Sequence, residues 1–445
     1  MATLVAEKPV KTVQEDQAAL LSAAMVPILA KAQNYAWGIS GGSSLVASIY
    51  SRNSLEPADG GKPYAELWMG THPSGPSRIQ SDPSVTLSSF LDTSENAFTI
   101  GEKEVRGLPY LLKILSVGGA LSIQAHPTRE LAKTLHAQNP SAYKDENHKP
   151  EMAIALSPFQ ALCGFRDCNE IVKDVARVPE FADAIGRVEA DEFVKSIKGS
   201  SDKAEALKKA FGSLMRQDEA QVTDCLKKLV QRLGKMEPEQ KTPQDKTLND
   251  LYAQYPGDVG CFAAYLMNKL DLEPNDAIFI GANEPHAYLQ GECVEIMANS
   301  DNVVRAGLTP KFKDVDVLVE MLTYKDGPPE VMKGDVVKKN LKMYRPPCED
   351  FQLEQVDLKK GESVKLDPAN GPSMLVTISG DGIVAMSQKK NSASMPLYPG
   401  TIYYCQPKNV FHVTCTSESP LIVYRSNVNE KLIMESRSGS ICTIH

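Results

Sequence analysis

The stretch "LSIQAHPTRELAKTLHAQNPSAYKDENHKPEMAIAL", residues 121–156, carries three of the seven histidines in the chain and sets the fold prediction. It opens with a strand-like alternation, passes through a helical segment and ends in a second apolar run. Alternate side chains of a strand lie on opposite faces, so Ser122, Gln124 and His126 share one face. A buried polar group without a partner costs about 1–3 kcal/mol. This polar row on an apolar strand therefore predicts partners from elsewhere in the chain.

Two further polar residues at the start of apolar strands are the predicted partners. Glu151 begins "EMAIAL", and His286 lies in "NEPHAYL". With Gln124 and His126 they supply an amide oxygen, a carboxylate and two imidazoles, a set typical of a divalent-metal site. Mixed nitrogen and oxygen ligands suit zinc, and iron and manganese remain alternatives. Without Glu151 and His286, the first two residues would be interpreted as a hydrogen-bonded pair inside a barrel.

The chain changes character twice along its length. Short apolar runs separated by Gly, Pro and Ser clusters indicate strands up to about residue 166. A lysine- and glutamate-rich segment then shows helical periodicity, with apolar residues from Val222 to Leu233 recurring along one helix face. Strand-like sequence returns from "GCFAAYLMNKLDL" (260–272) onward, after one more helical stretch. This order of β, α and β favours a helical domain inserted into a β domain.

An internal echo extends the prediction to a second β domain. The segments "EPNDAIFIGANEPHAYL" (273–289) and "LYPGTIYYCQPKNVFHVT" (397–414) each combine a turn, a strand, a proline and a histidine at the next strand, as at the end of a cupin unit. His412 in the second segment has no Q-x-H or H-x-H partner, so no metal is expected there. The predicted fold class is mainly β with an α insertion: two cupin-type jelly rolls plus an inserted helical domain. The expected parts are a flexible N-terminal tail (1–24), a catalytic jelly roll (25–166 and 256–335), a helical insertion (167–255) and a C-terminal jelly roll without metal (336–445).

Composition excludes several classes of protein. The net charge of the 445 residues is −8, which disfavours nucleic acid and anionic membranes as partners. No apolar run reaches the roughly 18–20 residues needed to cross a bilayer. The nine cysteines are scattered without a C-x-x-C pair and are odd in number, which fits reduced thiols. The apolar N-terminal stretch lacks a basic region before it, unlike a signal peptide. A cytoplasmic protein is predicted.

Several long motifs occur together and in order: "NYAWG", "YAELWMGTHPSGPS", "SIQAHP", "ENHKPEMAIAL", "LCGFR" and "NEPHAYLQGECVEIMANSDNVVRAGLTPK". In these the chain closely resembles type I mannose-6-phosphate isomerase (phosphomannose isomerase) of the cupin superfamily, from about residue 33 onward and least over the helical segment. The resemblance implies an isomerase with one Zn²⁺ per chain that interconverts mannose 6-phosphate and fructose 6-phosphate and feeds GDP-mannose synthesis. Its partner is a small sugar phosphate, and a monomer is expected, with oligomers left open.

The resemblance also implies roles for individual residues. The zinc ligands of the family fall on the four predicted ligands. Its arginine falls on Arg305, and its substrate-site lysines fall on Lys149 and Lys311. The remaining implied roles are phosphate contacts at Ser122 and Lys113 and a proton-transfer base at Glu295 or His148, with Asp301 close to them.

Simpler interpretations stay open for some of these residues. His148 could serve only as a neighbour of the site, Lys113 could extend to the surface from its apolar run, and Lys311 could be a plain surface charge. Glu295 lies on the strand face opposite Val294 and Ile296, and that face could be the site or solvent. His72 and His136 are interpreted as structural or exposed.

Two candidate bases beside a metal site favour proton transfer through an enediol over a direct hydride shift, which needs no base. Two rival functions are weighed against the isomerase. A cupin metal oxygenase would need open positions on iron, which a four-ligand set disfavours. A sugar-phosphate binding protein without turnover would be expected to lack part of the motif set, and every motif residue is present.

Overall fold

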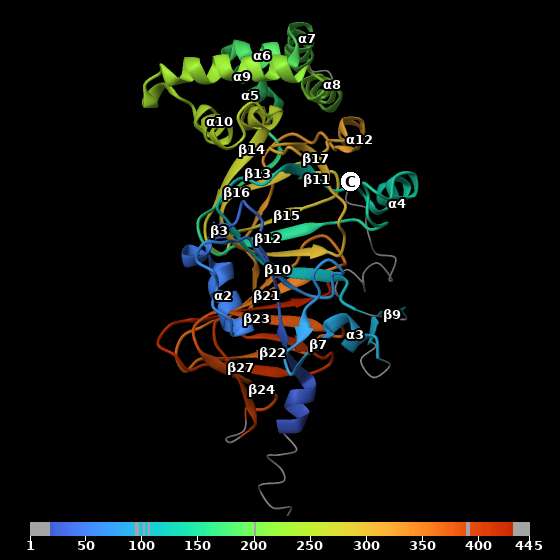
Figure 1. The fold of residues 1–445 in the computed structure, drawn as a ribbon, viewed down its shortest axis with the longest axis vertical. Coiled ribbons are helices and arrows are strands. Elements are labelled where there is room, and N and C mark those ends of the chain that lie inside the picture. Colours follow the sequence, from blue (N-terminus) through green and yellow to red (C-terminus); the bar gives the residue numbers. More distant parts are fainter. Residues whose placement is uncertain are drawn as a thin grey trace, which may run out of the picture.

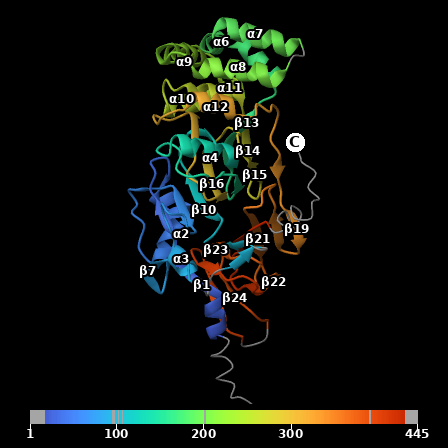
Figure 2. The same cartoon turned by 90° about the vertical axis from the view of Figure 1, so that its right-hand side faces the viewer.

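The computed structural model describes residues 18–93, 98–100, 103–105, 107–199, 202–388 and 392–429. Its three parts follow one another along the long axis of the molecule (Figure 1): helices at one end, a large sheet system in the middle and a second sheet system at the other end. The view turned by 90° shows the same order (Figure 2). This arrangement of two sheet systems and one helical insertion confirms the predicted fold class.

The central sheet system has eleven strands, and its longest strand, β16 (His286–Ala298), pairs with several of the others. Along its length β16 pairs with β10, β12, β11 and β13, so it brings segments distant in sequence together. The other strands are β2 (Lys31–Gln33), β5 (Glu66–Met69), β10 (Tyr110–Val117), β11 (Ile123–Ala125), β12 (Glu151–Ala155), β13 (Phe159–Phe165), β14 (Met267–Leu272), β15 (Ala277–Ile280), β17 (Val304–Gly307) and β18 (Val331–Met332). Helices α2 (Leu45–Ser54), α4 (Arg129–Gln138) and α12 (Val315–Met321) lie in its connections.

The helical insertion is built mainly from amphipathic helices: α5 (Cys168–Arg177), α6 (Pro179–Ile185), α7 (Arg187–Lys198), α8 (Lys203–Met215), α9 (Glu219–Gly234) and α10 (Pro243–Gln254). Helix α9 shows why they form. The Asp218 side chain accepts hydrogen bonds from the amides of Ala220 and Gln221 and caps the helix. The buried residues of α9 are those of the predicted apolar face, from Val222 to Leu233.

Helical structure continues past the predicted boundary at residue 255, through η3 (Val259–Phe262) and α11 (Ala263–Leu266). Residues 260–266 are buried on all sides. One more helical stretch was expected here, but outside the insertion, because a segment that is apolar all round has no single face that indicates what it packs against.

The second sheet system pairs a nine-stranded sheet with a four-stranded one. The larger sheet runs in the order β19 (Asp335–Lys338), β20 (Leu341–Tyr344), β21 (Gln352–Leu358), β28 (Leu421–Asn427), β23 (Ser373–Ser379), β26 (Ile402–Cys405), β1 (Met25–Leu29), β6 (Arg78–Ile79) and β7 (Asp82–Thr86). The smaller runs in the order β22 (Ser363–Leu366), β27 (Phe411–Cys415), β24 (Gly382–Ala385) and β25 (Ser394–Leu397).

Strand β1 connects the two sheet-rich parts of the chain. The sequence assigned it to the catalytic jelly roll, and in the structure it pairs antiparallel with β26, Met25 opposite Cys405, and continues into β6 and β7 of the same sheet. The C-terminal jelly roll is therefore completed by strands from the N-terminal region. Composition cannot reveal such a pairing, because it depends on contacts between distant segments.

The expected tail over residues 1–24 is also shorter than predicted in the part that the structure describes. Residues 18–24 are helical, and the side chains of Leu21 and Ala24 are buried in the core of the C-terminal jelly roll. This short apolar helix forms because that core supplies a surface for it. Residues 1–17 lie outside the described residues.

Two predictions from composition can be compared with the described residues. None of their helices is long and apolar enough to cross a membrane. All eight cysteines among them are free thiols, and Cys442 lies outside this part of the chain.

Strand alternation separates the core from the site. On β10 and β16, Leu112, Ile114, Val294 and Ile296 face a core shared with the C-terminal jelly roll. The residues between them face the opposite way, toward the interior of the central sheet system. Lys113 and Glu295 are among these inward residues and line a cleft there.

Candidate functional site

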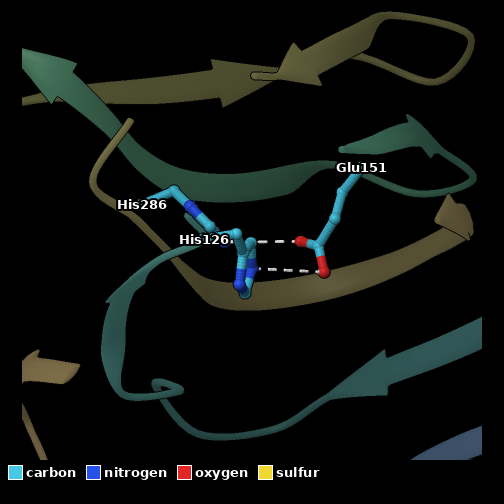
Figure 3. Close-up of side chains that lie close together, drawn as sticks. All are labelled: His126, Glu151 and His286. Carbon is cyan, nitrogen blue, oxygen red and sulfur yellow. Dashed lines mark ion pairs between the residues drawn. The ribbon is translucent and has the colours of Figure 1, made fainter. Parts of the chain in front are cut away.

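His126, Glu151 and His286 converge at one buried point of the central sheet system (Figure 3). Glu151 and His286 are the first residues of β12 and β16, and His126 directly follows β11. The imidazole Nε2 atoms of His126 and His286 lie 3.4 and 3.3 Å from the two carboxylate oxygens of Glu151. One ligand atom from each residue lies within 4.8 Å of the others, a spacing suited to a single metal ion.

The hydrogen bonds of the two histidines leave the atoms facing Glu151 free. The Nδ1 atom of His126 lies 2.8 Å from the carbonyl oxygen of Asn302, and that of His286 lies 3.0 Å from the carbonyl of Glu284. A carbonyl only accepts, so each Nδ1 carries the proton and each Nε2 presents a lone pair. Both Nε2 atoms are buried without a hydrogen-bond partner.

These lone pairs face a carboxylate, an arrangement that is repulsive unless a cation lies between them. Burial lowers the pKa of His126 to about 4, so its ring does not supply a proton there at neutral pH. The donor set of two imidazoles and a carboxylate therefore fits a divalent metal such as zinc.

Gln124 and Lys149 adjoin this cluster. Gln124 pairs with His286 across the β11–β16 ladder and lines the cleft, so it lies where a fourth ligand is expected. The Lys149 ammonium lies 2.8 Å from a carboxylate oxygen of Glu151 and is mostly buried. It supplies a positive charge at the edge of the cluster.

The cleft beside the cluster has a volume of about 470 Å³, enough for a small ligand. Most of the residues predicted for the site line it: Lys113, Ser122, Gln124, Lys149, Glu151, Glu295, Asp301, Arg305 and Lys311. The structure thus brings together residues from across the central sheet system around one opening.

One wall of the cleft carries a buried ion pair. Lys113 and Glu295 are directly opposite across β10 and β16, and the ammonium lies 2.9 Å from the carboxylate. Burial raises the pKa of Glu295, and Lys113 opposes this rise. Burial alone would lower the pKa of Lys113, but its carboxylate neighbours raise it, so the lysine stays charged. A buried carboxylate with a raised pKa at a cleft is a candidate for proton transfer.

Three other predicted residues differ in their surroundings. Arg305 lies opposite Gln124 on β17 and is partly buried, and burial lowers its pKa. It has no carboxylate within ion-pair distance among the described residues, unlike Lys113 and Lys149. Ser122 is partly buried at the cleft, and Lys311 is exposed at its rim. The guanidinium of Arg305 is thus the cation best placed to receive an anionic ligand.

His148 and Asp301 differ in their relation to the cleft. Among the described residues, the cleft lining includes Asp301 but not His148. The His148 Nε2 atom lies 3.0 Å from Asp350 of the C-terminal jelly roll. Asp301 is exposed, and its carboxylate lies 3.5 Å from Nε2 of His72 and accepts a hydrogen bond from Ser74.

Sequence reasoning missed three buried residues that line the cleft: Glu66, Trp68 and His72. Glu66 and Trp68 are two residues apart on β5, so they share its cleft face. The signal was present, because Glu66 is a charged residue in an apolar strand, the same pattern that singled out Lys113. His72 was interpreted as structural or exposed, and the structure shows it 3 % exposed with its ring edge-on to Trp68.

Comparison with protein families gives three matches in sequence order. Residues 25–168 match "Phosphomannose isomerase type I, catalytic domain", residues 184–267 match its helical insertion domain, and residues 343–389 match its C-terminal domain. The second match ends close to Leu266, where the helical structure ends.

Similar proteins and structures agree with these matches. Mannose-6-phosphate isomerase 1 of Arabidopsis thaliana is 39% identical over 413 residues, covering 90% of this chain and 93% of its own length. Mannose-6-phosphate isomerase of Homo sapiens is 40% identical over 419 residues, covering 90% and 97%. A crystal structure of mannose 6-phosphate isomerase with zinc and yttrium superposes with a TM-score of 0.77 at 28% identity, covering 91% and 99% of the two chains. The apo form from Salmonella typhimurium gives 0.75 at 28% identity, with the same coverage.

Proposed function

We propose, from the premise that the chain belongs to the type I phosphomannose isomerase family, that it interconverts mannose 6-phosphate and fructose 6-phosphate with one bound zinc ion per chain, by proton transfer through an enediol. The observation that carries this proposal is the pair of unpartnered imidazole lone pairs facing Glu151 beside a cleft that contains Glu295 and Arg305.

Gln124, His126, Glu151 and His286 would hold the metal. Three of them form the buried cluster, and Gln124 lies next to His286 on the neighbouring strand. When bound, zinc supplies a Lewis acid that stabilises negative charge developing on the sugar oxygens. The backbone carbonyls that bind the two Nδ1 atoms fix the orientation of both rings toward the metal position.

Glu295 is the base that we assign to the proton transfer. The reaction removes a proton from C2 of the open-chain aldose and returns one to C1, while the proton of the C2 hydroxyl passes to the oxygen on C1. One carboxylate can serve for both transfers at carbon. Burial raises the pKa of Glu295 toward the working pH, which makes it a better proton acceptor than an exposed carboxylate. Lys113 holds this carboxylate in place on the cleft wall.

Arg305, Lys149, Lys311 and Ser122 form the cationic and polar part of the cleft that would receive the substrate phosphate. Arg305 offers a guanidinium without a carboxylate partner in the described chain, and such a group can bind a phosphate through two parallel hydrogen bonds. Binding at this end positions the reacting carbons at the other. A local cluster of cations also reconciles an anionic substrate with a chain of net charge −8.

We propose a cytoplasmic monomer that acts on a small sugar phosphate, binds neither nucleic acid nor membranes, and feeds GDP-mannose synthesis. The catalytic jelly roll carries the metal and the cleft, the helical insertion walls one side, and the C-terminal jelly roll binds no metal.

The decisive experiment measures fructose 6-phosphate formed from mannose 6-phosphate with a coupled enzyme assay. Run in deuterated water, the same reaction is expected to leave deuterium at C1 of fructose 6-phosphate, because a proton held by Glu295 can exchange with solvent. Absence of product would refute the isomerase. Complete retention of hydrogen over many turnovers would contradict an exchanging base and favour a hydride shift.

A further inference from the structure

Glu66 is a buried carboxylate in the cleft wall that no step of the proposed isomerisation uses. It lies on β5, is 7 % exposed, and accepts a hydrogen bond from the indole nitrogen of Trp68. One of its oxygens also lies 3.3 Å from the ammonium of Lys113. A buried charge is costly unless it is paired, so its place beside Lys113 requires an explanation.

Lys113 is shared between two carboxylates. Its ammonium lies 2.9 Å from Glu295 on one side and 3.3 Å from Glu66 on the other, and 5.3 Å from the ring centre of Trp68. The strand register fixes this order, because Lys113 on β10 is opposite Glu295 on β16 and opposite Trp68 on β5. Two negative charges therefore compete for one positive charge inside the protein.

We infer that Glu66 is a positioning residue for the isomerisation, acting on Glu295 through Lys113. An ammonium paired with Glu295 alone would stabilise its carboxylate and make it a weak proton acceptor. Glu66 pairs with the same ammonium, which weakens the attraction between Lys113 and Glu295, and its negative charge also repels the Glu295 carboxylate. The inference rests on the proposed function, in which Glu295 is the base.

The charges around Glu295 support this role. Burial raises the pKa of Glu295, Lys113 and Lys149 lower it, and Glu151 and Glu66 raise it further. The titratable groups that face it are Lys113, Glu66, Glu151, Lys149, Tyr288 and Cys293. Lys149 contacts the metal ligand Glu151, whereas Glu66 contacts Lys113 and Trp68. Glu66 can thus be changed with the proposed ligand set intact.

The test compares the pH dependence of kcat/KM for the wild type and Glu66→Gln, with the zinc content measured for both. A base acts when ionised, so the rate rises as the pH passes its pKa. Without the charge of Glu66, Lys113 stabilises ionised Glu295 more strongly. The acidic limb of the pH profile, where kcat/KM rises with pH, should then move to lower pH by about one unit, a tenfold change in the ionisation equilibrium of Glu295. The pH-independent value of kcat/KM above this limb should fall several-fold, because the base is weaker.

Two further variants keep the test decisive. Lys113→Met removes the shared cation and should move the limb in the opposite direction, to higher pH. Glu66→Asp keeps the negative charge, but the shorter side chain places it farther from Lys113. The acidic limb should therefore move to lower pH, as for Glu66→Gln, but by less. This variant also serves if Glu66→Gln does not fold.

If the acidic limb of Glu66→Gln stays in place while kcat/KM falls equally at every pH, Glu66 is only a structural residue and the inference is overturned. A shift of the Glu66 variants in the same direction as Lys113→Met would overturn it as well. Failure of the proposed function is distinct from both. It would appear as a wild type that forms no fructose 6-phosphate, or as a fully active Glu295→Gln.

Discussion

The Nε2 atom of His148 lies 3.0 Å from a carboxylate oxygen of Asp350, in a contact that joins the central sheet system to the C-terminal jelly roll. Arg129 reaches the same nitrogen at 2.6 Å. The imidazole is engaged there and does not line the cleft, whereas the next residue, Lys149, lines it and contacts Glu151. We therefore expect His148 to orient Lys149 rather than to accept the substrate proton.

Substitution of each candidate base by glutamine separates two roles, proton transfer and support of Lys149. Glu295→Gln should lower kcat by about 10²–10⁴-fold, the usual contribution of a general base, with zinc retained. His148→Gln and Asp350→Asn should each lower kcat by only several-fold, because both variants only loosen the support of Lys149. Steady-state kinetics with metal analysis checks this. A fully active Glu295→Gln with an inactive His148→Gln would transfer the base role to His148.

Removal of one proposed ligand should remove the metal. His286→Ala leaves one imidazole, His126, and one carboxylate, Glu151, in the buried cluster. We expect it to lose zinc, and to lose activity by about a thousandfold, since Lewis-acid stabilisation is worth several kcal/mol. The matched control is His412→Ala in the C-terminal jelly roll. His412, the histidine that the sequence echo pairs with His286, lies opposite Lys365 and Ala385 on neighbouring strands. It should keep metal and activity. Elemental analysis that finds a metal-free but fully active wild type would refute the metal site.

Arg305 should determine the response to phosphate. Arg305→Ala is expected to lower kcat/KM for mannose 6-phosphate by at least about a hundredfold, because charged hydrogen bonds are worth about 1.5–3 kcal/mol each. Competitive inhibition by inorganic phosphate should weaken in parallel. Arg305→Lys should recover only part of the loss, since lysine cannot form the bidentate contact. Unchanged phosphate inhibition in an inactive Arg305→Ala would instead give Arg305 a role at the reacting carbons.

The helical segment before β1 offers a test of stability. Leu21 is 2 % exposed in the C-terminal core, so Leu21→Ala should lower the free energy of unfolding by about 2–5 kcal/mol. Its neighbour Leu20 is 62 % exposed, and Leu20→Ala should change the free energy of unfolding by less than about 0.5 kcal/mol. Denaturant titration measures both. Equal effects would contradict the packing of this segment.

Local patterns in the sequence were enough to predict part of this structure. The apolar face of α9 follows from residue spacing, because a helix buries every third or fourth side chain. The two-residue period of strands indicated that Glu295 lies opposite Val294 and Ile296, and the structure shows that its face borders the cleft. Gln124, His126, Glu151 and His286 could be grouped by their ligand chemistry. Their roles, like those of the other site residues, stay predictions.

Other features depend on contacts between distant segments and left no local signal. The pairing of β1 with β26 and the burial of Leu21 need the folded C-terminal core. The direction of the His148 side chain depends on Asp350, in another domain. Glu66 is different, because its charge within an apolar strand was visible. Its meaning was not, since only the register of β5, β10 and β16 reveals that it shares Lys113 with Glu295.

The position of β1 has a consequence for biosynthesis. Met25 leaves the ribosome long before Cys405, yet the two are neighbours in one sheet. The edge of β1 that pairs with β26 must therefore stay unpaired until residues 402–405 have been translated, and exposed strand edges are prone to aggregation. A nascent chain that stops before residue 402 cannot close the nine-stranded sheet. The segments between these strands should thus fold before this sheet is closed.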